Sequence, residues 1–180
     1  MTAKSDFSPN TNEAGNYAGG IAGDVFYCTI ENCYYSGKVS VSDYAGGIAG
    51  YVHGSDNAPT TIKNCVSLAE SVSGSDYVNR IAGYNYNATL TNNYAWDGTT
   101  INGNPVPADG AAGVNGADLT YAGGKLSEQF SEIFKNDSAW KFTEDGLPIL
   151  KNVGGTQFSE LPKCMTGVGF DGFGIKTNPY

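Results

Sequence analysis

The sequence predicts an all-β protein, built as a β-solenoid of about three coils with a small α+β cap at its C-terminal end. One phrase recurs, as YAGGIAG at 17–23 and 44–50 and as YVNRIAG at 77–83. Between these phrases, apolar and polar residues alternate over short stretches, and no helical apolar period appears before residue 124. A unit of about 27 residues cannot bury its own apolar face. Stacking of successive units would bury one continuous column.

The predicted solenoid occupies residues 17–104, and its three units are called unit 1, unit 2 and unit 3. Unit 1 covers 17–43, unit 2 covers 44–76 and unit 3 covers 77–104. Unit 2 is longer because it carries an insertion around the stretch HGSDNAP. The preceding residues 1–16 contain no apolar signal-peptide core and are interpreted as the remnant of a further unit.

Stacked units place equivalent residues above one another at the strand spacing of about 4.8 Å. The sequence therefore predicts ladders of identical or similar side chains along the stack. The expected ladders are Tyr17/Tyr44/Tyr77, Ile21/Ile48/Ile81, Asn32/Asn64/Asn92 and Asn16/Asp43/Asp76. In the last ladder, short polar side chains would cap the turn before each tyrosine.

The glycines of the repeated phrase differ in how constant they are between units. Arg80 stands in unit 3 where unit 2 has Gly47, which predicts that this position needs no small residue. Gly23, Gly50 and Gly83 are the same in all three units. The sequence therefore places the backbone constraint at Gly50 and predicts that Gly47 tolerates a large side chain.

Residues 105–152 are predicted to form a loop, a helix and a hairpin that together cap the last coil. Apolar residues spaced for one helix face predict a helix over 125–136. The stretch AWKFTEDGLPILKN predicts two strands joined by a turn at Asp145-Gly146. A cap is expected because the last coil would otherwise expose unpaired backbone. Residues 153–180 form a tail segment to which the sequence assigns no role.

Composition excludes several classes of function. The formal net charge is −8 and Arg80 is the only arginine, so no basic face for nucleic acid is expected. No run of about 18 apolar residues occurs, so no membrane insertion is expected. His53 is the only histidine, which excludes the H-E-x-x-H zinc motif; we interpret it as a surface-loop residue. We therefore expect no catalytic, cofactor-binding or metal-binding residues.

The four cysteines leave their redox state open. Cys33 and Cys65 occupy equivalent positions, so they form either a disulfide or metal pair, or a ladder of small buried thiols. The ladder is favoured because neighbouring parallel strands rarely offer good disulfide geometry. Cys28 and Cys164 have no evident partner.

The tyrosines are the strongest candidates for ligand contacts. Aromatic side chains on a β-surface combine an apolar ring with a polar handle, which suits sugars. The ligand-contacting residues expected from the sequence are Tyr35, Tyr51, Tyr84 and Tyr86. The column Tyr17/Tyr44/Tyr77 is expected to serve mainly in packing.

Two units carry a pattern that resembles a known repeat. In unit 1 it comprises Gly19-Gly20-Ile21-Ala22-Gly23, then Ile30, Asn32, Cys33 and Tyr34. In unit 2 it comprises Gly46-Gly47-Ile48-Ala49-Gly50, then Ile62, Asn64 and Cys65. The pattern is similar to the GLUG-motif repeat of bacterial surface proteins over residues 14–100. Unit 3 departs from it at Asn79, Arg80 and Asn93.

The resemblance implies a right-handed parallel β-helix at the cell surface or in a secreted protein, and it implies no enzymatic activity. We expect a non-enzymatic adhesion or ligand-presentation module, with a host molecule or a polysaccharide as ligand. It would be a monomer or part of a longer chain. The alternatives are a fragment of a carbohydrate-active enzyme and a purely structural stalk.

Overall fold

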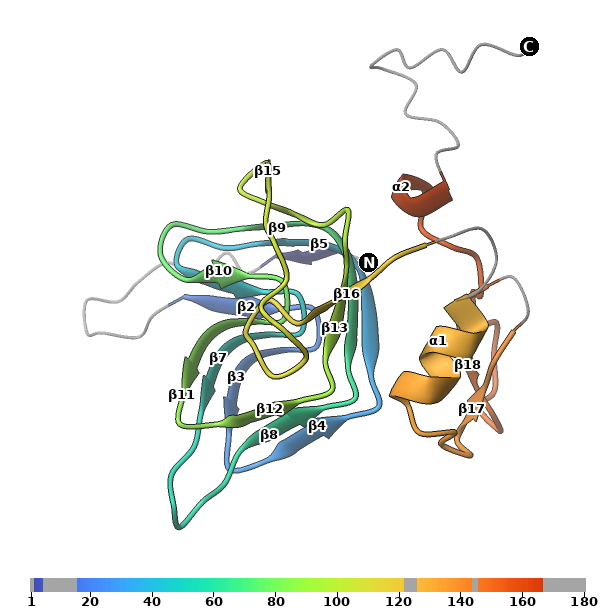
Figure 1. The fold of residues 1–180 in the computed structure, drawn as a ribbon, viewed down its shortest axis with the longest axis horizontal. Coiled ribbons are helices and arrows are strands. Elements are labelled where there is room, and N and C mark those ends of the chain that lie inside the picture. The colour runs from blue at the N-terminus through green and yellow to red at the C-terminus, as the bar shows by residue number, and fades with distance from the viewer. Residues whose placement is uncertain (1, 5–15, 122–125, 144–145, 167–180) are drawn as a thin grey trace.

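The computed structural model describes residues 2–4, 16–121, 126–143 and 146–166 (Figure 1). The described chain is predominantly β, which confirms the all-β class. Helices in these ranges are limited to α1 (Leu126–Ile133) and the single turn α2 (Lys163–Thr166).

Each unit contributes four short strands. Unit 1 forms β2 (Tyr17–Gly19), β3 (Ala22–Phe26), β4 (Thr29–Glu31) and β5 (Tyr34–Ser40). Unit 2 forms β6 (Tyr44–Gly46), β7 (Ala49–His53), β8 (Thr61–Lys63) and β9 (Val66–Ser73). Unit 3 forms β10 (Val78–Asn79), β11 (Ala82–Tyr86), β12 (Thr89–Thr91) and β13 (Tyr94–Trp96), followed by β14 (Thr100–Ile101) and β15 (Asn104–Pro105).

Equivalent strands of the three units pair in parallel. The first three strands of each unit form three separate sheets, with orders β10-β6-β2, β11-β7-β3 and β12-β8-β4. The fourth strands join a larger sheet with the order β1-β5-β9-β13-β16, where β1 is Thr2–Lys4 and β16 is Ala117–Leu119. Tyr17 lies opposite Tyr44 and Ile30 opposite Ile62, so the units stack in the expected register (Figure 1).

Backbone hydrogen bonds repeat along the stack at one step of each unit. In each unit, two consecutive backbone N–H groups donate to one carbonyl oxygen of the segment that comes next in the stack. Ile21 and Ala22 donate to Ile48 at 3.0 and 3.2 Å, Ile48 and Ala49 to Ile81 at 2.9 and 3.0 Å, and Ile81 and Ala82 to Val114 at 2.9 and 3.1 Å. Val114, in the segment after unit 3, thus takes the place of a fourth isoleucine.

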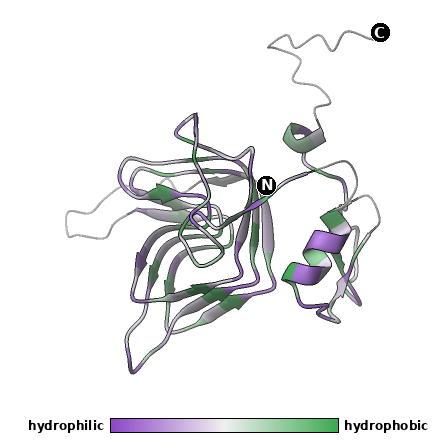
Figure 2. Cartoon of the chain, in the orientation of Figure 1, coloured by the Kyte–Doolittle hydropathy of each residue, from purple (hydrophilic) through white to green (hydrophobic). Residues whose placement is uncertain are grey.

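The core of the stack is a column of aliphatic side chains. Along each strand, alternate residues point inward, as the pleat of a β-strand requires. Fully or almost fully buried members are Val25, Val52, Ile48, Ile62, Ile81 and Ala95. Figure 2 shows hydrophilic and hydrophobic stretches on the same strands and both kinds of residue on α1.

The expectation that Gly47 tolerates a large side chain is wrong. A Cβ atom on Gly47 would lie less than 3.0 Å from the backbone oxygen of Arg80 in the next unit. A Cβ on Gly50 would also be crowded, at 2.6 Å from the backbone nitrogen of Ala18. Gly50 does not have a positive φ, so close approach between neighbouring backbones requires both glycines. Arg80 is compatible with its position because the chain that follows unit 3 takes a different path.

The expected cap is corrected in its placement. The segment 105–119 covers the end of unit 3, where β16 pairs in parallel with β13. Helix α1 and the hairpin of β17 (Trp140–Lys141) and β18 (Ile149–Leu150) instead lie beside the stack, against the largest sheet (Figure 1). The reason is a second apolar cluster on the outer face of that sheet. It comprises Val66, Leu68, Leu119, Leu126, Phe130, Ile133, Phe134, Leu147 and Met165.

The other C-terminal expectations are met in part. The helix is shorter than predicted, because Lys135 and Asn136 adopt left-handed φ values of 52° and 54° and end it. The antiparallel pairing of Trp140 with Leu150 confirms the hairpin, whereas residue 145 of its predicted turn lies outside the described residues. At the N-terminus, Thr2–Lys4 pairs in parallel with Lys38–Ser40, and residues 5–15 lie outside the described part.

Candidate functional site

The most distinctive surface of the stack is a continuous patch of rings, which we call the aromatic face. It lies on the outer side of the two adjacent sheets β2-β6-β10 and β3-β7-β11. Neighbours of the inward-pointing Val25 and Val52 along their strands point outward and form it. Its members are Tyr17, Tyr44, Tyr77, Tyr51, Tyr84, Phe26, Tyr27, His53 and Tyr86.

The first column of the aromatic face contains the tyrosines that open each unit. The ring centroids of Tyr17 and Tyr44 are 5.1 Å apart with an interplanar angle of 27°, and those of Tyr44 and Tyr77 are 5.0 Å apart with the rings perpendicular. These distances are typical of favourable aromatic pairs. The column therefore contributes packing between units as well as surface.

The second column runs along β7 and β11, where Tyr51 lies opposite Tyr84. Their rings stack at 5.6 Å and 21°. The ring centroids of Tyr51 and Tyr17 are 5.1 Å apart, and those of Tyr84 and Tyr77 are 4.4 Å apart, so the two columns are in contact. In unit 1 the equivalent position is Asp24.

The third column contains Phe26, His53 and Tyr86, which are paired in register across the three units. The Phe26 and His53 rings are stacked and nearly parallel, with centroids 3.9 Å apart and an interplanar angle of 3°. His53 Nε2 lies 3.2 Å from Oδ1 of Asp24. His53 ends a strand within this column, so the interpretation as a loop histidine is corrected.

The insertion of unit 2 is fastened beside this column. The Thr60 hydroxyl donates to the carbonyl oxygen of His53 at 2.7 Å and accepts from the backbone N–H of Tyr27 at 2.9 Å. Thr60 is buried. The extra residues of unit 2 therefore hold the third column in place.

Within the aromatic face, the rings differ in accessibility. Phe26, Tyr27 and Tyr86 are 44%, 57% and 53% exposed, whereas the faces of Tyr44 and Tyr51 are largely covered by neighbouring rings. Burial and the neighbouring phenols raise the pKa of Tyr44 and the pKa of Tyr51. These phenols are therefore neutral at physiological pH and present O–H donors and oxygen acceptors around exposed rings.

The sequence identified part of this face. Tyr51, Tyr84 and Tyr86 belong to it. Tyr35 does not, because it is 3% exposed and its hydroxyl donates to the carbonyl oxygen of Lys38 inside the fold, which corrects its expected role. Phe26 was missed, although its alignment with Tyr86 in the equivalent strand was a usable signal.

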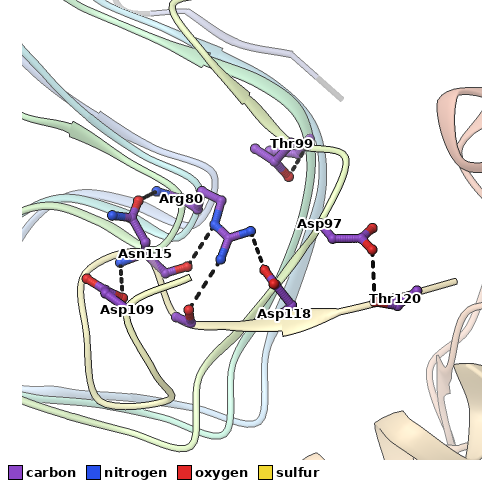
Figure 3. A network of polar contacts seen from close by, with 9 residues as sticks. Arg80, Asp97, Thr99, Asp109, Asn115, Asp118 and Thr120 are labelled. Atoms are coloured by element: carbon purple, nitrogen blue, oxygen red, sulfur yellow. Dashed lines mark hydrogen bonds and ion pairs between the residues drawn. The ribbon is translucent and has the colours of Figure 1, made fainter. Parts of the chain in front are cut away.

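A buried arginine holds the chain that closes the stack. Arg80 is fully buried and its Nη1 lies 2.7 Å from Oδ1 of Asp118 (Figure 3). Its other guanidinium nitrogens donate to the carbonyl oxygens of Asn115 and Gly116 at 3.0 and 3.3 Å. The Asn115 side chain accepts from the Arg80 backbone N–H, and Asp109 accepts from the Asn115 N–H (Figure 3). Arg80 therefore has a structural role, and its charge is compensated from within the fold.

A polar cavity of about 420 Å³ lies between this closing chain and helix α1. Its carboxylates are Asp118 and Glu132, with Thr120 and Gln129 between them in the lining. Asp118 is already paired with Arg80. The cavity thus offers one carboxylate without an arginine partner, whereas cleavage of a glycosidic bond commonly uses two.

Cys33 and Cys65 form a pair of thiols, as the favoured ladder interpretation predicts. A hydrogen bond from the Cys65 side chain lowers the pKa of Cys33, and the same interaction together with burial raises the pKa of Cys65. Cys33 is therefore the more acidic and more accessible thiol. The described residues contain no group of three or more side chains suited to a metal ion.

Comparisons with protein-family models, with curated proteins and with solved structures find no match to this chain. No helix in the described ranges is long and apolar enough to span a membrane. Any functional conclusion therefore depends on the geometry of the chain itself.

Proposed function

We propose that this chain is a non-enzymatic module of a secreted or cell-surface protein that binds a neutral polysaccharide on its aromatic face. We further propose that its stack is a right-handed parallel β-helix, as the parallel, in-register pairing of equivalent strands supports. The observation that carries the functional proposal is the contiguous array of rings across three units. In a purely structural stalk, nothing would favour exposed Phe26 and Tyr86 at matched positions.

The chemistry of the aromatic face favours an uncharged ligand. Rings bind the apolar C–H faces of sugars, and phenols hydrogen-bond to their hydroxyl groups. Asp24 borders the face and the chain carries a net charge of −8, so an acidic polysaccharide would be repelled. Three stacked units present rings along one line, which suits an extended chain of sugars.

A panel of neutral and acidic polysaccharides tests this proposal by affinity electrophoresis. We expect retardation in at least one neutral polysaccharide, and about tenfold weaker binding for Phe26→Ala combined with Tyr86→Ala, because two exposed contacts of about 0.5–1 kcal/mol each are lost. Phe158→Ala is the matched control, since Phe158 is 78% exposed outside the aromatic face.

Two results would reject the proposal. One is wild-type binding by the Phe26/Tyr86 double variant, and the other is a lack of retardation by every neutral polysaccharide. Release of reducing ends that disappears in Glu132→Gln would instead identify a carbohydrate-active enzyme acting from the polar cavity.

A further inference from the structure

The two ends of the stack differ in how they are covered. At the unit 3 end, the segment 105–119 provides both β16 and the Val114 carbonyl. At the unit 1 end, β2, β3 and β4 each pair with one neighbour in the described chain, on the unit 2 side. We call the unit 1 surface formed by these three strands the open end. We propose that the open end is a docking surface for another unit of the same type, supplied by a further polypeptide segment.

The first line of evidence is the repeated backbone step. The carbonyl oxygens of Ile48, Ile81 and Val114 each accept two consecutive N–H groups. The carbonyl of Ile21 holds the equivalent position in unit 1, yet within the described residues it receives no such pair. The open end therefore presents the acceptor half of an interaction that the rest of the stack completes.

Burial of the isoleucine ladder gives independent evidence. Ile48 and Ile81 are fully buried, whereas Ile21 is 44% exposed. Full coverage of an aliphatic side chain stabilises by about 25 cal/mol for each Å² of apolar surface removed from water. Ile21 thus has the same side chain and the same register as its partners, but among the described residues no further unit covers it.

Two apolar hollows extend the open end toward the hairpin. They have volumes of about 410 and 430 Å³ and share Ile21, Tyr34, Trp140 and Leu150 in their linings. Next to them, β1 already pairs in parallel with the outer edge of β5. Parallel addition of a strand at this end is therefore realised in the fold for the fourth sheet and incomplete for the other three.

The identity of the occupant follows from the glycine pair. Cβ atoms on Gly19 or Gly20 would collide with the backbone of unit 2, so a unit packs on its successor only with glycine at these positions. An occupant of the open end must likewise bring glycines against Ile21 and Ala22. A unit carrying the GGIAG phrase meets this requirement.

A second copy of the complete chain does not present a free unit that could bind the open end. The matching surface of unit 3 is already covered by Val114 and held by Arg80 and Asp118. End-to-end association of whole chains would need this segment to leave. The occupant is therefore a further unit and not a second intact chain.

The test is a fusion in which a second copy of residues 44–65, which holds the first three strands of unit 2, precedes Met1 through a flexible Gly/Ser linker, which provides a high effective concentration. The matched control fusion carries valine in place of both glycines of the added GG pair. We expect slower amide exchange across 17–31 and a higher urea midpoint in the first fusion than in the control.

Equal exchange and equal midpoints in the two fusions would overturn the proposal, because an added unit would then gain nothing from its glycines. Self-association of the unfused chain that is abolished by Ile21→Glu, detected by analytical ultracentrifugation, would also overturn it in favour of a second copy as the occupant. Neither result depends on polysaccharide binding, so this proposal and the proposed function fail separately.

Discussion

Substitution of Gly47 by alanine tests how closely the units approach. The added Cβ would lie less than 3.0 Å from the Arg80 carbonyl oxygen and 2.9 Å from Cβ of Ser67. Rotation of the Ser67 side chain moves its Oγ but leaves its Cβ in place, and the Arg80 oxygen belongs to the backbone of the next unit. It directly precedes Ile81, whose carbonyl accepts two hydrogen bonds at 2.9 and 3.0 Å. Relief of the clash therefore disturbs the step that joins unit 2 to unit 3.

The expected cost combines two terms. Overpacking of a close-packed site costs about 1–3 kcal/mol, and each weakened backbone hydrogen bond adds about 1 kcal/mol. We expect Gly47→Ala to lower the free energy of unfolding by about 3 kcal/mol. With a urea dependence of about 2 kcal/mol per M, the midpoint would fall by about 1.5 M.

Urea unfolding followed by far-ultraviolet circular dichroism measures this shift. Gly154→Ala is the control, because a Cβ there meets nothing within 4 Å and Gly154 has no positive φ. The control is expected to stay within about 0.5 kcal/mol of the wild type. A Gly47→Ala protein as stable as this control would refute the claim that neighbouring backbones require glycine.

Three further substitutions probe separate features. Ser67→Ala should leave stability unchanged or raise it by up to about 1 kcal/mol in the same unfolding assay, since the buried Ser67 hydroxyl oxygen has no hydrogen-bond partner among the described residues; a clear loss would show a hidden partner. Cys65→Ala should raise the pKa of Cys33 toward that of an ordinary thiol, because it removes the hydrogen-bond donor that favours the Cys33 thiolate. Alkylation of Cys33 should then be slower at neutral pH. Cys65→Ser keeps a donor and should show less change. Asn64→Gly is compatible with the left-handed backbone at this position, φ 52°, but removes two side-chain hydrogen bonds. The free energy of unfolding should fall by about 1–2 kcal/mol. An unchanged urea midpoint would contradict a stabilising role of the ladder.

Local sequence patterns were sufficient for features that repeat along the stack. The ladder of Asn32, Asn64 and Asn92 is confirmed, since Nδ2 of Asn64 donates to Oδ1 of Asn32 at 3.0 Å and Nδ2 of Asn92 donates to Oδ1 of Asn64 at 2.7 Å. Equivalent positions in parallel strands lie side by side, so alignment of the units was enough to predict contacts. The tyrosine columns follow for the same reason.

Comparison of units failed where the neighbours of equivalent residues differ. Arg80 occupies the position of Gly47, but the chain beyond unit 3 follows a path that leaves room for a guanidinium. A substitution series within a stack therefore reports on the local neighbour as well as on the position. The backbone constraint expected at Gly50 is a close approach between neighbouring backbones. A left-handed backbone occurs at Asn64, where the side chain also forms the ladder.

The position of the helix was not predictable from local pattern. An amphipathic stretch shows that α1 must bury one face, but it does not say which surface covers it. The choice depends on outward-pointing Val66 and Leu68, which the strand pattern alone does not distinguish from core residues. Contacts such as Trp140 Nε1 to the Asn32 carbonyl, at 3.1 Å, join residues more than one hundred positions apart.

The asparagine ladder also fixes how many units lie between its two ends. At one end Nδ2 of Asn32 donates to Asp137 at 2.6 Å, and at the other Nδ2 of Asn92 donates to the carbonyl oxygen of Ile133 at 3.0 Å. Residues 133–137 thus span the three units and set the distance between the two ends of the ladder. A unit duplicated between them would move the two anchor points about 4.8 Å further apart and break one of them. A duplicated unit is therefore compatible with both anchors only outside the interval between Asn32 and Asn92.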